Sequence, residues 1–266
     1  GRMLGVVPDA MTSDVPGRAV PELAQGAARD LSWLEGLQLP DIPIRWDERV
    51  IRYLEFFRDD PRGCSIIRSW MVRVERYGAL IRRTLRDEGL PEDLLYLAMI
   101  ESGFDPRARS DAGAVGLWQF VSGTGEEYGL EQTHWLDQRM DPVASTRAGA
   151  RYLEALHTRF GTWELAFASY NMGYGAMLRS MRKYGTNDFW LLSRMEAALP
   201  LETSLYVAKV MACAVGGRNL AQFGMADLAR EPELAWDEVA VPGGTTFAQI
   251  ARATDATSED LRRLNP

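Results

Sequence analysis

One carboxylate stands where an acid for proton transfer would be expected. Glu101 follows an unbroken apolar run, Leu94 to Ile100, which predicts a helix that is buried all round. Burial disfavours the charged form of a carboxyl group, so we expect a raised pKa. A carboxylic acid that stays partly protonated near neutral pH can donate a proton to a glycosidic oxygen. The competing interpretation is a glutamate that has emerged into solvent at a helix end, or one in an ion-pair network.

Two glycine-punctuated stretches add polar and aromatic groups. Gly103, Gly113 and Gly116 predict a tightly turned segment in which a ligand can approach the backbone. Residues 116–120 (Gly-Leu-Trp-Gln-Phe) supply an amide between two aromatics, and residues 169–175 (Ser-Tyr-Asn-Met-Gly-Tyr-Gly) supply a hydroxyl, an amide and aromatics. Aromatic faces and amides suit sugar rings and N-acetyl groups. Aromatic residues at helix ends are nonetheless often core residues.

The elements that position these groups are predicted to be helices. Helical spacing of apolar residues begins near Trp46, and a second, clearer pattern runs from Ile66 to Leu85 and ends at Gly89. We expect Trp46, Trp70 and Phe160 to be core residues. Further helices are predicted from Pro91 as first helical residue, over 141–160 and 162–170 with Asp141 and Thr162 as caps, over 175–184, and over 201–215 until Gly216-Gly217. The body, about 30–223, is therefore expected to be all-α.

The two ends of the chain differ from this body. Residues 1–28 carry scattered prolines and no periodicity, which predicts an extended arm or linker. Residues 224–236 are expected to be a second linker. Residues 236–242 alternate like a short strand, and helix-like segments follow at 247–251 and from 258. The pattern predicts a small α/β module over 237–266 that lacks a return strand.

Composition limits the function classes. The chain has 266 residues, 46% hydrophobic and 25% charged, which is the balance of a globular protein. The net charge of −7 argues against a nucleic-acid partner. No apolar run approaches the roughly 20 residues that a membrane helix needs, and no leader pattern opens the chain. We expect any signal peptide or lipid anchor to have been removed, or never to have existed.

The cysteines and histidines predict no metal site. Cys64 and Cys213 match no zinc pattern or disulfide framework, so two buried thiols are expected, with a single bridge as the alternative. His134 and His157 lack ligand spacing and are interpreted as surface or helix residues. No metal and no other cofactor is expected.

Four motifs in order carry a resemblance to a known family. Residues 101–106 (Glu-Ser-Gly-Phe-Asp-Pro) with 108–110, and residues 113–120, resemble the family 1 lytic transglycosylases of bacterial peptidoglycan. Residues 168–173 are similar to the family's Ala-Tyr-Asn-x-Gly motif, with Ser in place of Ala, and residues 202–207 match its Glu-Thr-x-x-Tyr-Val motif. Trp118, where most subfamilies carry Met, and the helical segment 46–88 resemble the membrane-bound murein transglycosylase D subgroup. The 237–266 tail resembles the first two-thirds of a LysM repeat, which binds N-acetylglucosamine-containing glycans.

The resemblance implies a goose-lysozyme-like, all-α catalytic domain of the SLT type over 29–223. Its reaction is cleavage of the β-1,4 bond between N-acetylmuramic acid and N-acetylglucosamine without water, giving 1,6-anhydro ends. Glu101 would be the catalytic residue, acting first as acid and then as base. The substrate-binding residues implied by position are Ser102, Ser110, Gln119, Tyr170, Asn171, Glu202 and Tyr206. Ser102 has an alternative role as a cap of the turn, and Tyr206 as a core residue.

Alternatives to this function remain open at this point. A muramidase that uses water would be expected to carry helper carboxylates, yet 112–125 contains no Asp or Glu, and Asp105 and Asp111 fall in predicted turns. Glu126 or Glu127 could fold back. A glycan-binding pseudoenzyme would have no need of the acid. The expected partner is peptidoglycan glycan in the bacterial periplasm, for a monomeric chain whose outer-membrane anchor, if any, lies outside it.

Overall fold

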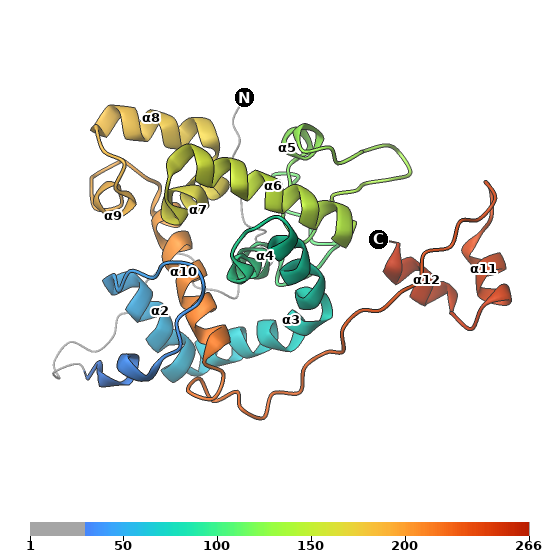
Figure 1. Cartoon of the computed structure of the whole chain (residues 1–266), viewed down its shortest axis with the longest axis horizontal. Helices are drawn as coiled ribbons and strands as arrows, with labels where there is room; N and C mark the ends of the chain where they lie inside the picture. Colours follow the sequence, from blue (N-terminus) through green and yellow to red (C-terminus); the bar gives the residue numbers. More distant parts are fainter. Residues whose placement is uncertain (1–29, 266) are drawn as a thin grey trace.

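Helices make up the regular structure of the described residues. The computed structural model describes residues 30–265, so the arm expected over 1–28 and Pro266 lie outside the described residues. The elements are η1 (Ser32–Gly36), α2 (Glu48–Asp59), α3 (Pro61–Asp87), η2 (Glu92–Leu94), α4 (Leu95–Ser102), α5 (Ser122–Glu127), α6 (Pro142–Phe160), α7 (Trp163–Met172), α8 (Tyr174–Tyr184), α9 (Phe189–Leu192), α10 (Leu201–Arg218), α11 (Phe247–Ala253) and α12 (Ser258–Leu264) (Figure 1). The all-α class expected for the body is confirmed.

The short strand predicted over 236–242 is wrong. Residues 229–242 have no regular structure, and the β-bridges among the described residues are isolated pairs elsewhere, such as Val115 with Phe120. A strand needs a neighbour for its N–H and C=O groups, and no described segment pairs with 236–242. The tail therefore contains the helices α11 and α12 but, within the described residues, no sheet.

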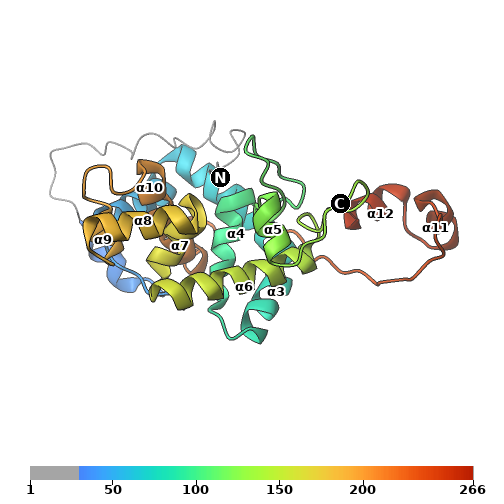
Figure 2. The same cartoon turned by 90° about the horizontal axis from the view of Figure 1, so that it is seen from above.

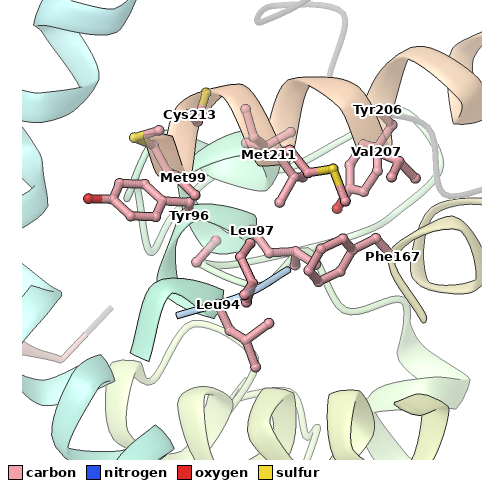
Figure 3. Close-up of a cluster of buried hydrophobic side chains, with 14 of the residues drawn as sticks. Leu94, Tyr96, Leu97, Met99, Phe167, Tyr206, Val207, Met211 and Cys213 are labelled. Atoms are coloured by element: carbon pink, nitrogen blue, oxygen red, sulfur yellow. The ribbon is translucent and has the colours of Figure 1, made fainter. Parts of the chain in front are cut away.

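Helix α4 lies at the centre of the helical body (Figures 1 and 2). All eight of its residues are buried, as the apolar run predicts. It packs against α3 and α10, and α10 packs in turn against α2 and α7. Leu97 of α4, Phe167 of α7 and Met211 of α10 belong to one apolar cluster (Figure 3). The last turn of α4, which carries Glu101, is thus held by packing on several sides.

Helix α10 continues past the glycines that were predicted to stop it. It runs to Arg218, through Gly216 and Gly217. A Cβ on Gly217 would overlap the Tyr96 hydroxyl of α4, and one on Gly216 would lie 2.9 Å from Ile67 Cδ1 of α3. The prediction failed because these glycines serve close helix packing and not a helix end. They allow α10 to approach α4.

The capping predictions are confirmed at α6 and α7 and wrong at Pro91. Asp141 accepts hydrogen bonds from the N–H groups of Val143 and Ala144, and Thr162 accepts one from Leu165. Pro91 lies before the short helix η2 instead of beginning an α-helix. The Asp41 carboxylate accepts from the N–H groups of Glu92 and Asp93, at 2.7 and 3.0 Å, so η2 is capped from a distant segment. This long-range cap has no local sequence signal.

Three aromatic residues were expected in the core, and two are there. Trp70 and Phe160 are buried, 5% and 6% exposed. Trp46 is 40% exposed, so that prediction is wrong. Helix α2 begins only at Glu48, with Asp47 as its cap. Trp46 therefore precedes the helix and does not share its buried face.

The segment that follows α10 runs along α3 before it reaches the tail. The N–H of Glu231 donates to the Val72 carbonyl at 2.8 Å, and the N–H of Leu234 donates to the Arg76 carbonyl at 3.0 Å. An ion pair of 3.0 Å joins Arg76 to Glu231. Part of the predicted linker 224–236 is therefore docked on the body. None of the helices among residues 30–265 is long and apolar enough to cross a membrane.

Candidate active site

Glu101 lies in the last turn of α4 and is buried. Gly103, in the left-handed conformation with φ of 59°, ends the helix immediately after Ser102. The Glu101 side chain is 7% exposed. Burial raises its pKa to about 7, although the hydroxyl of Tyr206, which donates to Glu101 Oε1 at 2.5 Å, opposes that shift. A group with this pKa exchanges protons readily near neutral pH.

Helix α10 supplies the groups that surround the Glu101 carboxyl. Glu202, Tyr206 and Lys209 are spaced by four and three residues, which places them on one helix face. The Glu202 carboxylate raises the pKa of Glu101, whereas the Lys209 ammonium lowers it. Burial raises the pKa of Glu202 itself and lowers that of Lys209. Tyr206 extends from α10 toward α4 and α7 (Figure 3).

The loop over 108–120 is a tight, internally bonded turn, as its glycines predict. Val115 and Phe120 exchange two backbone hydrogen bonds, of 3.0 and 3.1 Å. Gly116 has a φ of 86°, and a Cβ there would overlap the carbonyl oxygen of Arg139. The Arg139 guanidinium donates to the carbonyls of Gly113 and Phe120, at 3.1 and 3.2 Å. These contacts hold the loop firmly beside α6.

Gln119 is the strained residue of this loop. Its φ of 48° lies in the left-handed region, which non-glycine residues enter rarely and at a cost. Its Nε2 donates to the carbonyls of Gly116 and Ala108, at 2.9 and 3.2 Å. Its Oε1 is buried and accepts no hydrogen bond from any described residue. Gln119 lines a small chamber of about 40 Å³, and its Oε1 is an unsatisfied buried acceptor among the described residues.

A larger cleft of about 970 Å³ adjoins the chamber. Tyr152 and Asn171 line both spaces. The ring centroid of Tyr152 lies 5.1 Å from that of Tyr170 and 5.0 Å from that of Tyr128, which gives the wall a row of three tyrosines. The cleft is lined by Thr124, Glu127, Tyr128, Tyr152, Ala155, Leu156, Asn171, Met172, Gly173, Tyr174, Gly175, Ala176, Arg179, Pro200, Glu202 and Thr203. Its size and its mixture of rings and amides suit an oligosaccharide.

The residues singled out from the sequence fall into two groups in the structure. Gln119, Tyr170, Asn171 and Glu202 line the chamber or the cleft. The Tyr170 hydroxyl donates to the Trp118 carbonyl at 2.6 Å, and Asn171 Oδ1 accepts from the Thr203 hydroxyl at 2.7 Å. Both side chains are therefore fixed by the protein, which leaves the Tyr170 ring and the Asn171 amide nitrogen for a ligand.

The second group, Glu101, Ser102, Ser110 and Tyr206, lines neither space. Ser102 is completely buried, and its hydroxyl bonds to the carbonyls of Leu117 and Ala98, at 2.9 and 3.2 Å. It ties the end of α4 to the 116–120 turn. Ser110 is 8% exposed, and its hydroxyl oxygen accepts from the Ala114 N–H at 2.9 Å. The hydroxyl proton of Ser110 remains available to donate.

Sequence reasoning missed Tyr152, Tyr128 and Arg179 as lining residues. Tyr152 occupies an ordinary position within the predicted helix 141–160, and no local motif distinguishes it. Trp118 was noted in the motif, but it is completely buried, and its indole N–H donates to the Thr146 hydroxyl at 3.0 Å. Trp118 therefore supports the site from behind.

The remaining candidates for chemistry lie elsewhere. Cys64 and Cys213 are both free thiols, with Cys213 buried and Cys64 partly buried, so the bridge alternative is not realised. The rings of His134 and His157 pack on Trp135 and Trp163, at centroid distances of 4.5 and 4.1 Å. Across the described part of the chain, no group of three or more His, Cys, Asp or Glu side chains could hold a metal ion.

Comparisons with known proteins find relatives of the region that contains the candidate site. Residues 79–193 match the family described as "Transglycosylase SLT domain". Membrane-bound lytic murein transglycosylase D of Escherichia coli K12 is 32% identical over 209 residues, 77% of this chain and 45% of that protein. Membrane-bound lytic murein transglycosylase F of Alcanivorax borkumensis is 34% identical over 139 residues, 47% of this chain and 28% of that protein. This chain thus spans less than half the length of these relatives.

A solved structure is similar as well. The lytic transglycosylase Slt of Pseudomonas aeruginosa, in an inactive mutant form, is 28% identical with a TM-score of 0.44, covering 59% of this chain and 25% of that one. The match to the family covers Glu101, the 116–120 turn and the end of α7, whereas the α10 residues of the site described above lie outside it. Residues 79–193 are thus similar to the transglycosylase SLT domain family, and 209 residues of the chain are similar to membrane-bound lytic murein transglycosylase D.

Proposed function

We propose that this chain is a peptidoglycan lytic transglycosylase with Glu101 as its single catalytic acid and base. The observation that carries the proposal is the buried Glu101 carboxyl, whose pKa is raised to about 7 by burial and in part by Glu202, a residue that lines an aromatic cleft of about 970 Å³. The SLT domain over 79–193 supports the reaction class. The substrate would be the glycan strand of alternating N-acetylglucosamine and N-acetylmuramic acid.

In the first step protonated Glu101 donates its proton to the glycosidic oxygen. The bond between the anomeric carbon and that oxygen breaks, and the departing sugar keeps the proton as its hydroxyl. The acetamido oxygen of N-acetylmuramic acid attacks the anomeric carbon, so the substrate supplies the nucleophile that many glycosidases take from a second carboxylate. The Tyr206 hydroxyl, already bonded to Glu101, then stabilises the carboxylate that is left.

In the second step the Glu101 carboxylate acts as a base. It accepts the proton of the C6 hydroxyl, and that oxygen attacks the anomeric carbon and displaces the acetamido oxygen. The product is a 1,6-anhydro ring, and Glu101 is protonated again for the next turnover. The reaction consumes no water. A pKa near 7 suits both steps because the group must give and take one proton at the same pH.

The surrounding residues would hold the substrate in place. We propose that the Ser110 hydroxyl and the Gln119 amide bind the N-acetyl group and the sugar beside it, because each has an unused hydrogen-bonding group. Tyr170 and Asn171 would line the binding cleft. Glu202 would organise the α10 face, and Ser102 would support the site through its bonds to Leu117 and Ala98.

Hydrolysis is the second candidate, and Glu202 is the observation that favours it. Glu202 lines the cleft, and its charge raises the pKa of Glu101, so a second carboxylate is present near the acid. A water held between the two could attack the anomeric carbon. The other carboxylates that the sequence raised are exposed, and of these Glu127 lines the cleft, whereas Asp105, Asp111 and Glu126 do not. Asp105 accepts from the Arg107 N–H at 2.8 Å, and Asp111 lies in the turn after Ser110.

The test is mass spectrometry of muropeptides released from purified sacculi. The proposal expects products one water lighter than hydrolytic products, ending in 1,6-anhydro-N-acetylmuramic acid. Glu101→Gln should abolish release. Reducing-end products would assign hydrolysis, with Glu202→Gln as the next variant. Retained turnover in Glu101→Gln would overturn the role of Glu101, and binding without any product would support a glycan-binding protein.

We further propose an organisation and a location. Residues 29–223 would form the catalytic unit, and the α11–α12 tail would contact glycan in the bacterial periplasm, with an outer-membrane anchor outside this chain. The tail is held near the body, since the Arg107 guanidinium donates to the Arg262 carbonyl at 2.6 Å. Removal of residues 237–266 should weaken pull-down on insoluble peptidoglycan. Undiminished binding would remove the tail as a glycan contact.

A further inference from the structure

Arg179 is the only cation among the residues that line the described cleft. The other charged lining residues are Glu127 and Glu202. The chain as a whole carries a net charge of −7. A ligand carboxylate that entered this cleft would therefore be repelled along part of the wall and attracted at Arg179. The charges of the lining residues therefore favour binding of an anionic group at one location in the described cleft, next to Arg179.

The Arg179 guanidinium is not used by the fold. No described residue forms a hydrogen bond or an ion pair with it, whereas Arg139 and Arg218 are held by Asp137 and Asp93, at 2.8 and 2.9 Å. The side chain is exposed on α8. A Cβ on Gly175 would lie 3.3 Å from Arg179 Nη1, so the guanidinium lies over the first turn of α8, at the cleft wall. All of its N–H groups are available to a ligand.

We propose that Arg179 binds a carboxylate of the substrate and thereby sets the register of the alternating sugars in the cleft. This inference rests on the proposed function. The glycan backbone is uncharged, and its carboxylates occur on the N-acetylmuramic acid residues: on the stem peptide, or on the lactyl ether where the peptide is absent. A guanidinium recognises a carboxylate through two parallel hydrogen bonds. Arg179 thus distinguishes N-acetylmuramic acid from N-acetylglucosamine at one subsite.

The experiment measures affinity with uncut strands. Kd is determined in the Glu101→Gln background for peptide-bearing strands, for strands stripped of stem peptides, and for both after their carboxyls have been converted to methylamides. Arg179→Gln is compared with Arg182→Gln, which removes the same charge from an exposed position three residues along α8, outside the lining residues. Arg179→Lys tests whether charge alone suffices.

The expected result is a roughly tenfold rise in Kd for Arg179→Gln on carboxylate-bearing strands, the typical effect of losing a charged hydrogen bond. The methylamide strands should show no difference, Arg182→Gln should bind normally, and Arg179→Lys should keep part of the affinity. Loss on peptide-bearing strands identifies the stem peptide, and loss on stripped strands identifies the lactyl group. Equal losses on blocked and unblocked strands, or no loss, would overturn the proposal. Failure of the proposed reaction would appear separately, as a wild-type chain without anhydro products.

Discussion

Because the Glu101 carboxyl is buried, the free energy of unfolding of this protein should decrease as the pH rises. In the unfolded chain a glutamate titrates near 4.5, whereas burial raises the Glu101 pKa to about 7 in the folded protein. Between these values the native state holds a proton that the unfolded state has lost. Stability is therefore complete below about pH 4.5 and decreases as the pH rises, until the loss is complete above about pH 7.

The size of the effect follows from the shift. About 2.5 pKa units, from 4.5 to about 7, at 1.36 kcal/mol per unit give roughly 3 kcal/mol. The side chain is 7% exposed, so screening by solvent is small. Glu101→Gln keeps an oxygen that can accept from Tyr206 but has no carboxyl to ionise. The variant should therefore gain about 3 kcal/mol relative to the wild type between pH 4.5 and pH 8.

The assay is urea unfolding of both proteins at pH 4.5, 6 and 8, with the free energy of unfolding compared at each pH. Only the change in the difference with pH matters, because any packing effect of the amide is common to all three conditions. Glu127→Gln, which removes an exposed carboxylate from the cleft wall, controls for the loss of one negative charge. A stability difference that is constant from pH 4.5 to 8 would refute the argument that Glu101 is desolvated.

Three further predictions test the surroundings of this acid. Tyr206→Phe removes the hydrogen bond that favours the Glu101 carboxylate, so the alkaline limb of the pH–rate profile should move up by roughly one pH unit. An unmoved limb would contradict the assignment of that limb to Glu101. Ser102→Ala leaves the buried Leu117 carbonyl without its 2.9 Å hydrogen-bond partner. The free energy of unfolding should therefore fall by about 1–2 kcal/mol. An unchanged urea midpoint would show that this hydrogen bond contributes little. Gly149→Ala places a methyl group 2.7 Å from the Trp118 ring, so thermal unfolding should report a loss of about 1–3 kcal/mol unless the indole can shift freely.

The sequence alone predicted the helical body and the buried position of Glu101. Helical periodicity is a property of one segment, so the apolar run of α4 and the caps of α6 and α7 could be read locally. The burial of Glu101 followed for the same reason, because a helix that is apolar all round has no face for solvent. The tight 108–120 turn was signalled by its glycines.

Pairwise packing between distant segments was not encoded locally. Gly216 and Gly217 looked like a helix end, yet they allow α10 to approach α3 and α4. The strand predicted over 236–242 had the right alternation but no described partner. In each case the pattern was compatible with two structures, and the neighbouring segment decided between them.

Some residues that line the chamber and the cleft could be identified from the sequence, and others only from the structure. The motifs named Tyr170, Asn171 and Glu202, whereas Tyr152 and Arg179 became visible only when α6 and α8 were placed around the same space. Which face of a helix meets a cavity depends on how the helices pack, and that depends on contacts along the whole chain. The sequence therefore singled out Glu101 as the candidate acid, and the tertiary structure decided which rings and charges line the cleft.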